Sequence, residues 1–203
     1  MIRLYHAPQS RSSRIVWLLE ELGVDYEIVP VSIFRPMTGT GMPDLANPHP
    51  DKQVPALVHD GMLLAESVAI VLYLADFFPK AGLAPVAGDP RRGDYLTWLA
   101  WYAAGMEPSM LAAVAGELDA APMKRRSHDA MVKRLLDALE RGPYMMGADF
   151  SGADILIGSA IEFGRNAFPD SAPIDAYVAR CKARSAAQRA VGLDDAAGMQ
   201  RAA

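Results

Sequence analysis

The stretch KQVPALVHDG, residues Lys52–Gly61, together with Glu66 and Ser67 just after it, carries the most information about the fold of this chain. Pro55 has no backbone N–H, so it marks either the first residue of a strand or a cis turn that exposes the neighbouring backbone. The apolar run after it ends at Asp60-Gly61, the dipeptide favoured in a two-residue type I′ hairpin. The sequence therefore predicts two short strands joined by a tight turn.

A helix is expected directly after the second of these strands. Its apolar residues recur on one face: Val68, Val71, Leu72 and Ala75. Ser67 is expected to be the N-cap, because serine favours that position. The backbone N–H groups of a helix start form a site for a carboxylate. An exposed backbone edge beside a carboxylate site predicts a place for a peptide-like ligand.

The N-terminus predicts a strand, a loop and a helix in succession. Residues 2–5 alternate as a strand does, residues 6–13 form a loop, and the helix that follows stops at Gly23. A serine at a helix start is most often the N-cap, and Ser12 or Ser13 is expected to cap this helix. A second strand follows at residues 26–31. The first half thus runs strand, helix, strand, irregular segment, hairpin, helix, an order found in thioredoxin-like folds.

The second half of the chain predicts helices. A Pro- and Gly-rich break spans residues 79–90, and a long helix begins near Arg91, with Pro108 expected to bend it. Another helix is expected over residues 123–140. Ser151 and Asp154 have the spacing of a capping box, a motif that specifies folding and does no chemistry. Cys181 falls in a late helix and is interpreted as a packing residue.

These features resemble the cytosolic glutathione transferases, in particular the bacterial and fungal Gtt-like group. The similarity rests on SRSSRIVWLLEEL (residues 10–22), on HPDKQVP (residues 49–55), and on Val-Pro and Glu-Ser pairs twelve residues apart. Lys52 departs from the pattern, because this group usually carries glycine there. The resemblance implies an α/β plus all-α protein: residues 1–80 a thioredoxin-like glutathione-binding domain (βαβαββα), 81–90 a linker, and 91–203 an all-helical C-terminal domain.

The resemblance implies an enzyme that conjugates reduced glutathione to hydrophobic electrophiles or reduces peroxides with it. A binding or regulatory protein of the same fold with little catalysis is an alternative, since fold does not imply function. A glutathione-dependent isomerase is another, because the serine-rich loop before Arg14-Ile15 also resembles that of zeta-class proteins. The Val-Pro and Glu-Ser pairs favour a glutathione-binding enzyme over a non-catalytic protein.

Catalysis with glutathione requires a lowered thiol pKa, since a thiol pKa of roughly 8.5 leaves only a few per cent as thiolate at neutral pH. A hydroxyl donor and the N-terminus of the first helix can supply the stabilisation. By resemblance, Ser10 is the thiolate partner. Tyr5, Ser12 and a backbone amide remain alternatives, with Tyr5 expected to be buried in the sheet. No cysteine lies in the loop, which argues against a mixed disulfide with the protein.

The remaining ligand contacts are also implied by the resemblance. Val54, before a cis Pro55, pairs its backbone with the cysteinyl part of glutathione. Glu66 takes the α-amine of the γ-glutamyl end and Ser67 its carboxylate. Gln53 or Lys52 reaches the glycine carboxylate, although Lys52 is equally well interpreted as a solvated loop residue. The expected pocket for the electrophile lies between the domains and is lined by Phe34, Met37, Tyr102, Met106 and Met110.

Composition argues against several other classes of protein. A net charge of −4 argues against a broad nucleic-acid surface, and the longest apolar stretch, residues 68–75, is too short to span a bilayer. The start of the chain lacks the pattern of a secretory signal, and a single cysteine fits a reducing compartment. The four histidines match no metal-ligand spacing and are interpreted as structural or solvent-facing. We therefore expect a cytoplasmic protein without metal, and the resemblance implies a homodimer whose co-substrate is glutathione.

Overall fold

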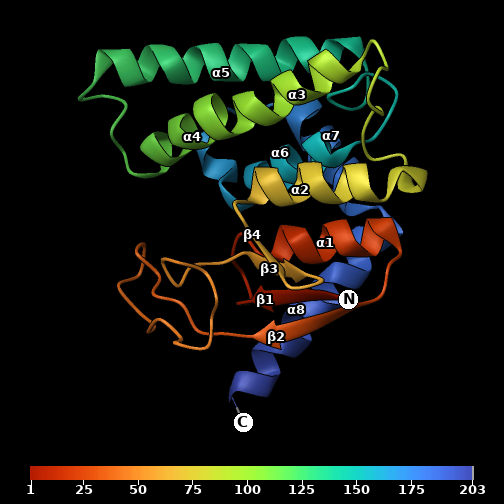
Figure 1. Ribbon diagram of the computed structural model, residues 1–203. Coiled ribbons are helices and arrows are strands. Elements are labelled where there is room, and N and C mark those ends of the chain that lie inside the picture. Colours follow the sequence, from red (N-terminus) through yellow and green to blue (C-terminus); the bar gives the residue numbers. More distant parts are fainter. Residues whose placement is uncertain (203) are drawn as a thin grey trace. The chain divides into compact units, whose positions relative to one another are not determined.

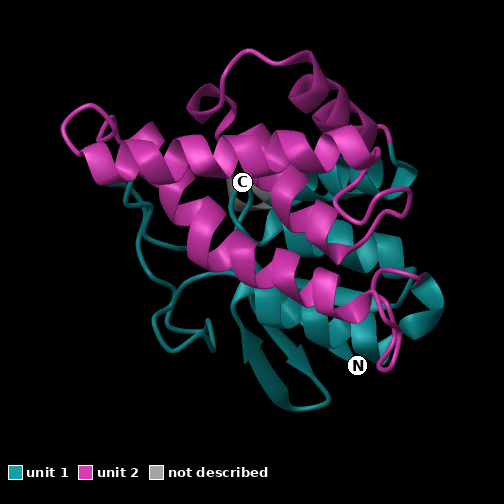
Figure 2. Ribbon diagram, turned by 90° about the horizontal axis from the view of Figure 1, so that it is seen from above, with its two compact units in different colours: residues 1–81, 184–203 teal, residues 82–183 magenta. Residues whose placement is uncertain are grey.

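The computed structural model describes residues 1–202, with side chains through residue 197 (Figure 1). The chain forms two compact units (Figure 2). One contains residues 1–81 together with the segment from Arg184 onward, and the other contains Gly82–Ala183. The predicted division, with residues 91–203 in one domain, therefore differs from the structure in its last helix, which joins the first unit.

The first unit is built on a four-stranded sheet of order β2-β1-β3-β4. The strands are β1 (Ile2–His6), β2 (Tyr26–Pro30), β3 (Ala56–His59) and β4 (Met62–Ala65). Strand β1 runs parallel to β2 and antiparallel to β3, and β3 and β4 form the hairpin. Helix α1 (Ser13–Leu22) connects the parallel pair, and α2 (Ser67–Phe77) follows β4. The predicted thioredoxin-like fold is confirmed. Between β2 and β3 the described chain is irregular, so the second helix of the expected βαβαββα order is absent and that part of the prediction is wrong.

Both predictions about the decisive stretch can be read from the backbone. The Val54–Pro55 peptide bond is cis, so the second of the two interpretations of the proline is the correct one. Asp60 and Gly61 have φ values of 49° and 86°. Positive φ at both central residues is what a type I′ turn requires. The predicted hairpin is confirmed, with His59 paired to Met62.

Helix α8 (Ser185–Ala202) belongs to the first unit because it packs along α1. Arg184 makes two hydrogen bonds to the carboxylate of Glu21, at 2.5 and 2.8 Å. Arg189 Nε donates to Glu20 at 2.6 Å. These pairs lie between residues more than 160 positions apart, so no local pattern in the sequence predicts them.

The second unit is helical, as predicted. Its helices are α3 (Arg92–Trp101), α4 (Glu107–Val114), α5 (Pro122–Arg141), α6 (Gly152–Phe163) and α7 (Ala172–Lys182). A π-helical segment, Tyr102–Met106, connects α3 to α4 just before Pro108. The expected distortion at Pro108 therefore takes the form of one widened turn, which accommodates a residue without a backbone N–H.

The predicted capping box at the start of α6 is present. The carboxylate of Asp154 accepts from the Ser151 backbone N–H at 2.9 Å and from the Met145 N–H at 2.8 Å. Tyr177 donates its hydroxyl to the same carboxylate at 3.1 Å. Cys181 is buried one helical turn beyond Tyr177, which agrees with a packing role. No helix among residues 1–202 is both long and apolar enough to cross a membrane.

Candidate functional site

The register of the sheet brings three predicted site segments to one end of the first unit. Ala56 is paired with Tyr5 on β1 and with Ala65 on β4. The residues next along the chain are Pro55 before β3, Glu66 after β4 and the loop after β1. Val54 packs with Ala7 and Val31, which joins the cis-proline segment to that loop. The structure therefore assembles the predicted glutathione contacts around the end of β1.

The loop from Ala7 to Ser13, here called the serine loop, leads from β1 into α1. Ser12 occupies the N-cap position, but its hydroxyl does not cap the helix. The Ser12 hydroxyl is fully buried and lies 2.8 Å from Nδ1 of His6, and it accepts from the Ala7 backbone N–H at 3.1 Å. The prediction is therefore confirmed for the position of Ser12 but not for its hydroxyl, which binds a buried histidine and a loop amide and makes no capping hydrogen bond.

Ser10 and Ser13 are half-buried at the same loop. The Ser10 hydroxyl donates to the Ala7 carbonyl at 2.6 Å and lies 2.8 Å from the Ser12 hydroxyl. Ser13 donates to the carboxylate of Asp194 on α8 at 2.5 Å. Ser12 is thus buried and Ser13 is bound to a carboxylate. Ser10 binds within its own loop, and its role as the thiolate partner stays a prediction.

Tyr5 and His6 lie on opposite faces of β1, because side chains alternate along a strand. His6 is buried and contacts the serine loop. Tyr5 is half-buried, where burial in the sheet was expected, and packs against the cluster of Ala7, Val31 and Val54. Among the described residues, its hydroxyl interacts with the Arg3 guanidinium of the same face. The Tyr5 side chain therefore lies on the face of β1 opposite to His6, and it is His6 that contacts the Ser12 hydroxyl.

The segment before the cis proline is held by a buried asparagine that the sequence analysis did not single out. Asn47 donates its side-chain N–H to the Gln53 carbonyl at 2.8 Å and accepts from the His49 N–H at 3.0 Å. The ammonium of Lys52 donates to the Asn47 carbonyl at 2.7 Å. Lys52 is half-buried and closes its own loop through this contact; its role toward the glycine carboxylate stays a prediction. Gln53 is exposed, so its side chain remains available to the glycine carboxylate.

The backbone at Lys52 explains the departure from the family pattern. Its φ is 56°, in the left-handed region that glycine adopts without steric cost. A lysine there costs roughly 1–2 kcal/mol relative to glycine. Gln9 (φ 52°) and Glu66 (φ 68°) also have positive φ, so three of the four described non-glycine residues with positive φ border the candidate site. Strained backbone of this kind is concentrated at binding sites in proteins.

Helix α2 starts one residue earlier than predicted. Glu66 is at the N-cap position and Ser67 is the first helical residue, so the prediction of Ser67 as N-cap is wrong. Ser67 is 7% exposed, and its hydroxyl has no hydrogen-bond partner within the described residues. A buried polar group without a partner is costly. Ser67 therefore still offers a hydroxyl, together with the helix start, for a carboxylate.

The residues expected to line the electrophile pocket divide between the units. Phe34 and Met37 lie on the irregular segment of the first unit and are 50% and 65% exposed. Tyr102, Met106 and Met110 are buried in the helical unit and are at most 2% exposed. As corrections to the prediction, these three present no surface to a ligand, since the helical spacing that selected them also marks core residues.

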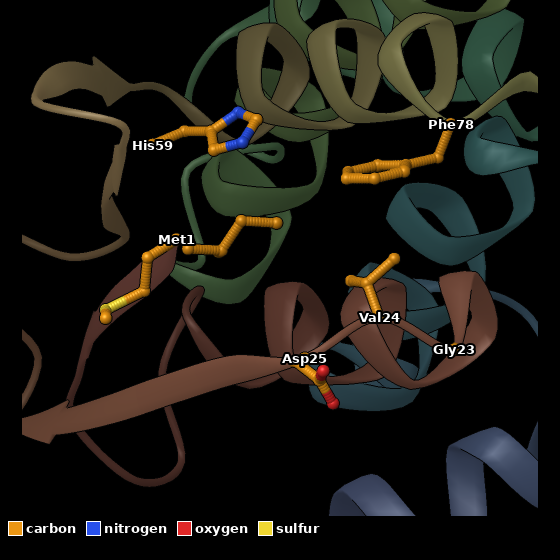
Figure 3. Close-up of a pocket in the computed structure, with 7 residues that line it drawn as sticks. Met1, Gly23, Val24, Asp25, His59 and Phe78 are labelled. Carbon is orange, nitrogen blue, oxygen red and sulfur yellow. The ribbon is translucent and has the colours of Figure 1, made fainter.

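A surface cavity of about 370 Å³ lies at the other end of the sheet (Figure 3). Its lining comes from the start of β1, from the turn after α1, from His59 and from Phe78. His59 is bound to the Tyr73 hydroxyl at 2.9 Å, a structural role of the kind predicted for the histidines. None of the predicted site residues lines this cavity, so the candidate chemistry lies elsewhere.

Asp194 and Asn47 carry no signal that singles them out in the sequence, and His6 was interpreted only as structural or solvent-facing. His6 and Asn47 are fully buried polar residues, and Asp194 is 9% exposed. Burial alone would raise the pKa of Asp194, but contacts with His6, Ser13 and the Gln9 N–H hold that pKa below its usual value. No spacing or motif in the last helix marks Asp194, since its partners are 181 and more positions away.

Comparisons with known proteins agree with this geometry. Residues 1–76 match the family described as the N-terminal domain of glutathione S-transferase. The chain is 32% identical over 174 residues to the disulfide-bond oxidoreductase YfcG of Escherichia coli (strain K12), covering 76% of each protein. It is 30% identical over 168 residues to glutathione S-transferase 3 of Zea mays, covering 75% of this chain and 73% of that protein.

A solved structure extends the likeness to both units. The glutathione S-transferase of a sphingomonad, complexed with glutathione, matches with a TM-score of 0.78 and 27% identity. The match covers 95% of this chain and 98% of that one. The family match, the maize relative, and the cis-proline and serine-loop geometry lead to one conclusion: this chain belongs to the glutathione S-transferase family.

Proposed function

We propose that this protein is a glutathione transferase that conjugates reduced glutathione to hydrophobic electrophiles, with glutathione as co-substrate and no resident cofactor. One observation carries the proposal: the cis Val54–Pro55 edge, the start of α2 and the half-buried Ser10 meet at one end of the sheet. The sphingomonad relative, whose structure holds glutathione, supports the choice of ligand.

In this proposal each part of glutathione meets a different segment. The backbone of Val54 pairs with the cysteinyl part, which extends the edge as an added strand. Ser67 and the first N–H groups of α2 bind the γ-glutamyl carboxylate, and Glu66 binds the α-amine. Gln53 reaches the glycine carboxylate. Lys52 is left out of this set, because its ammonium already binds the carbonyl of Asn47.

Ser10 then stabilises the thiolate. Its O–H turns from the Ala7 carbonyl toward the sulfur, and the N-terminus of α1 adds a favourable field. A thiolate is the reactive nucleophile, so lowering the thiol pKa raises the reactive fraction at neutral pH. The activated sulfur attacks the electrophile directly. No step uses a protein thiol.

Disulfide reduction is the second candidate, because the Escherichia coli relative is named as a disulfide-bond oxidoreductase. The one cysteine of this chain, Cys181, is 2% exposed in the helical unit. Reduction would therefore use two glutathione molecules. The first thiolate forms a mixed disulfide with the substrate, and the second releases the remaining thiol and leaves glutathione disulfide.

Calorimetric titration with reduced glutathione tests the binding site. The double variant Glu66→Ala plus Ser67→Ala is expected to lose most of the affinity. A matched control replaces Glu140 and Ser127 with alanine, since both are exposed on α5. Equal affinity in the site variant and the control would reject the assignment. Rates with chlorodinitrobenzene and with a small disulfide then separate the two reactions.

We also expect a homodimer in which the thioredoxin-like unit of one subunit faces the helical unit of the other. Light scattering at micromolar concentration measures the mass directly. A mass near the 21.9 kDa of one chain would reject this expectation.

A further inference from the structure

Asp194 lies on α8, yet its carboxylate contacts the serine loop at two points and His6 at the end of β1 at a third. Oδ2 accepts from the Gln9 backbone N–H at 2.9 Å. Oδ1 accepts from the Ser13 hydroxyl at 2.5 Å and lies 3.2 Å from Nε2 of His6, at ion-pair distance but outside hydrogen-bond geometry. The contacts join the C-terminal helix to the loop that carries Ser10. All of these residues belong to the first unit.

The contact with His6 determines where that ring carries its proton. An ionised carboxylate only accepts hydrogen bonds, so it favours the neutral tautomer with hydrogen on Nε2. Nδ1 then carries a lone pair and accepts the proton of the Ser12 hydroxyl, 2.8 Å away. A proton on Nδ1 would instead turn the lone pair of Nε2 toward the negative carboxylate.

The orientation of Ser12 acts in turn on Ser10. With its proton directed to His6, the Ser12 oxygen accepts from the Ala7 N–H and faces the Ser10 hydroxyl as an acceptor. Ser10 accepts from the Ser12 backbone N–H at 3.1 Å and keeps its own proton to donate. The Ala7 carbonyl, 3.1 Å from the Ser12 hydroxyl, is the competing acceptor for the Ser12 proton, so the protonation of Nδ1 of His6 decides between the two.

The loop backbone is held from two sides. Asp194 binds the N–H of Gln9, and Arg35 of the irregular segment binds the carbonyls of Gln9 and Pro8 at 3.1 and 2.6 Å. Gln9 sits in the left-handed conformation, at φ 52°. Such a conformation persists where surrounding contacts enforce it. Ser10 follows immediately, so its position depends on these contacts.

We propose that Asp194 is the positioning residue of the serine loop: it holds the Nε2–H tautomer of His6 and the turn at Gln9, and thereby presents Ser10 as a hydrogen-bond donor to the thiolate. Asp194 does not touch the ligand in this proposal; it acts through His6 and Gln9. The inference rests on the proposed function only for its effect on turnover. Its effect on His6 is independent of any substrate.

The first test is the tautomer of His6, observed in long-range ¹H–¹⁵N spectra of the full-length protein. In the wild type, Nε2 is expected to be protonated and Nδ1 unprotonated. In Asp194→Asn the ring is expected to shift toward the Nδ1–H form. Asp195→Asn is the matched control, because Asp195 is the exposed neighbour on the same helix. A wild-type ring protonated on Nδ1 would overturn the proposal, even if Asp194→Asn fails to fold.

The second test separates positioning from binding and from stability. In Asp194→Asn, kcat with chlorodinitrobenzene is expected to fall on the order of tenfold, the effect of one hydrogen bond to a charged group. KM for glutathione should change less than about twofold, since the site of Glu66 and Ser67 is untouched. Asp194→Glu should recover part of kcat by restoring the carboxylate. Kinetics identical to those of Asp195→Asn would reject the role of Asp194.

The two tests also distinguish the failure of this inference from failure of the proposed function. Wild-type protein that neither binds glutathione nor turns over substrate rejects the function, while the His6 spectra still decide whether Asp194 sets the tautomer. Active wild-type protein with an unchanged Asp194→Asn variant rejects the inference alone.

Discussion

Two buried aspartates of this protein both accept hydrogen bonds from backbone N–H groups and hydroxyls, but their pKa values are shifted in opposite directions. Asp154, in the capping box of α6, accepts from two backbone N–H groups and two hydroxyls. Asp194, on α8, accepts from one backbone N–H and one hydroxyl, beside an imidazole. Burial raises the pKa of Asp154 to about 6, although the four hydrogen-bond donors act to lower it. The pKa of Asp194 is lowered instead, although burial opposes the shift.

The difference lies in the remaining access to water. Asp154 is 0% exposed, so the loss of hydration outweighs its donors. The side chain of Asp194 is 13% exposed and lies next to the imidazole of His6. The comparison teaches that a hydrogen-bond pattern alone does not set the sign of a pKa shift. It also separates a carboxylate in a capping box from one that contacts the serine loop.

The largest expected effect is on stability at the capping box. Asp154→Ala leaves the N–H groups of Met145 and Ser151 and the hydroxyl of Tyr177 without their acceptor. Each unpaired buried group costs about 1–3 kcal/mol, so the free energy of unfolding should fall by about 3 kcal/mol or more. Urea denaturation measures it. A loss below about 1 kcal/mol would mean that water replaces the carboxylate.

The pH dependence of stability should have opposite sign at the two aspartates. The folded pKa of Asp154 lies above its unfolded value, so its contribution is full below pH 3.8 and is lost as pH rises through 6. The folded pKa of Asp194 lies below its unfolded value, so its contribution is present above pH 3.8 and is lost on acidification.

Denaturation between pH 3 and 7 measures this contrast. The stability of wild type relative to Asp154→Asn should fall with rising pH, by at most about 1.4 kcal/mol per pH unit. The stability of wild type relative to Asp194→Asn should rise over the lower part of that range. Slopes of the same sign in both series would contradict the assignment of opposite shifts.

Substitution of serine should separate chemistry from folding. Ser10→Ala is expected to reduce turnover of chlorodinitrobenzene on the order of tenfold and to raise the pKa of the bound glutathione thiol, with little change in affinity. Ser151→Ala should leave turnover unchanged and cost about 1 kcal/mol of stability through the lost cap. If the thiol pKa is unchanged in Ser10→Ala but shifted in Ser12→Ala or Tyr5→Phe, the thiolate-stabilising role belongs to Ser12 or Tyr5 instead. No shift in any of them would leave a backbone amide as the activating group.

The smallest expected effect concerns the anchor of α8. Arg184→Met removes two hydrogen bonds to Glu21, whose side chain is 8% exposed, and should cost about 1 kcal/mol. Lys133→Met is the control, since its pair with Asp137 is exposed on α5 and should be worth about 0.3–0.5 kcal/mol. Equal melting temperatures for the two variants would indicate that packing on α1, and not this ion pair, holds α8.

Local patterns were sufficient for much of the fold and part of the site. The hairpin at Asp60-Gly61, the capping box at Ser151 and the helix stop at Gly23 each depend on residues within a few positions. The prediction of Ser67 as N-cap was wrong by one residue, because Glu66 adopts the unusual backbone that starts the helix. The helical spacing of Tyr102 and Met106 predicted an apolar face but did not distinguish core from pocket.

The sequence by itself determined the strands, the helices and the short-range contacts, because turn geometry, capping and hydrophobic period act between neighbours in the chain. Tertiary structure alone decided that α8 returns to the sheet unit and places Asp194 against Gln9 and His6, 185 positions away in the case of Gln9. It also decided that the Ser12 hydroxyl binds a histidine and makes no capping hydrogen bond. The physical reason is that contacts over such separations depend on how the elements pack, and no local preference encodes that packing.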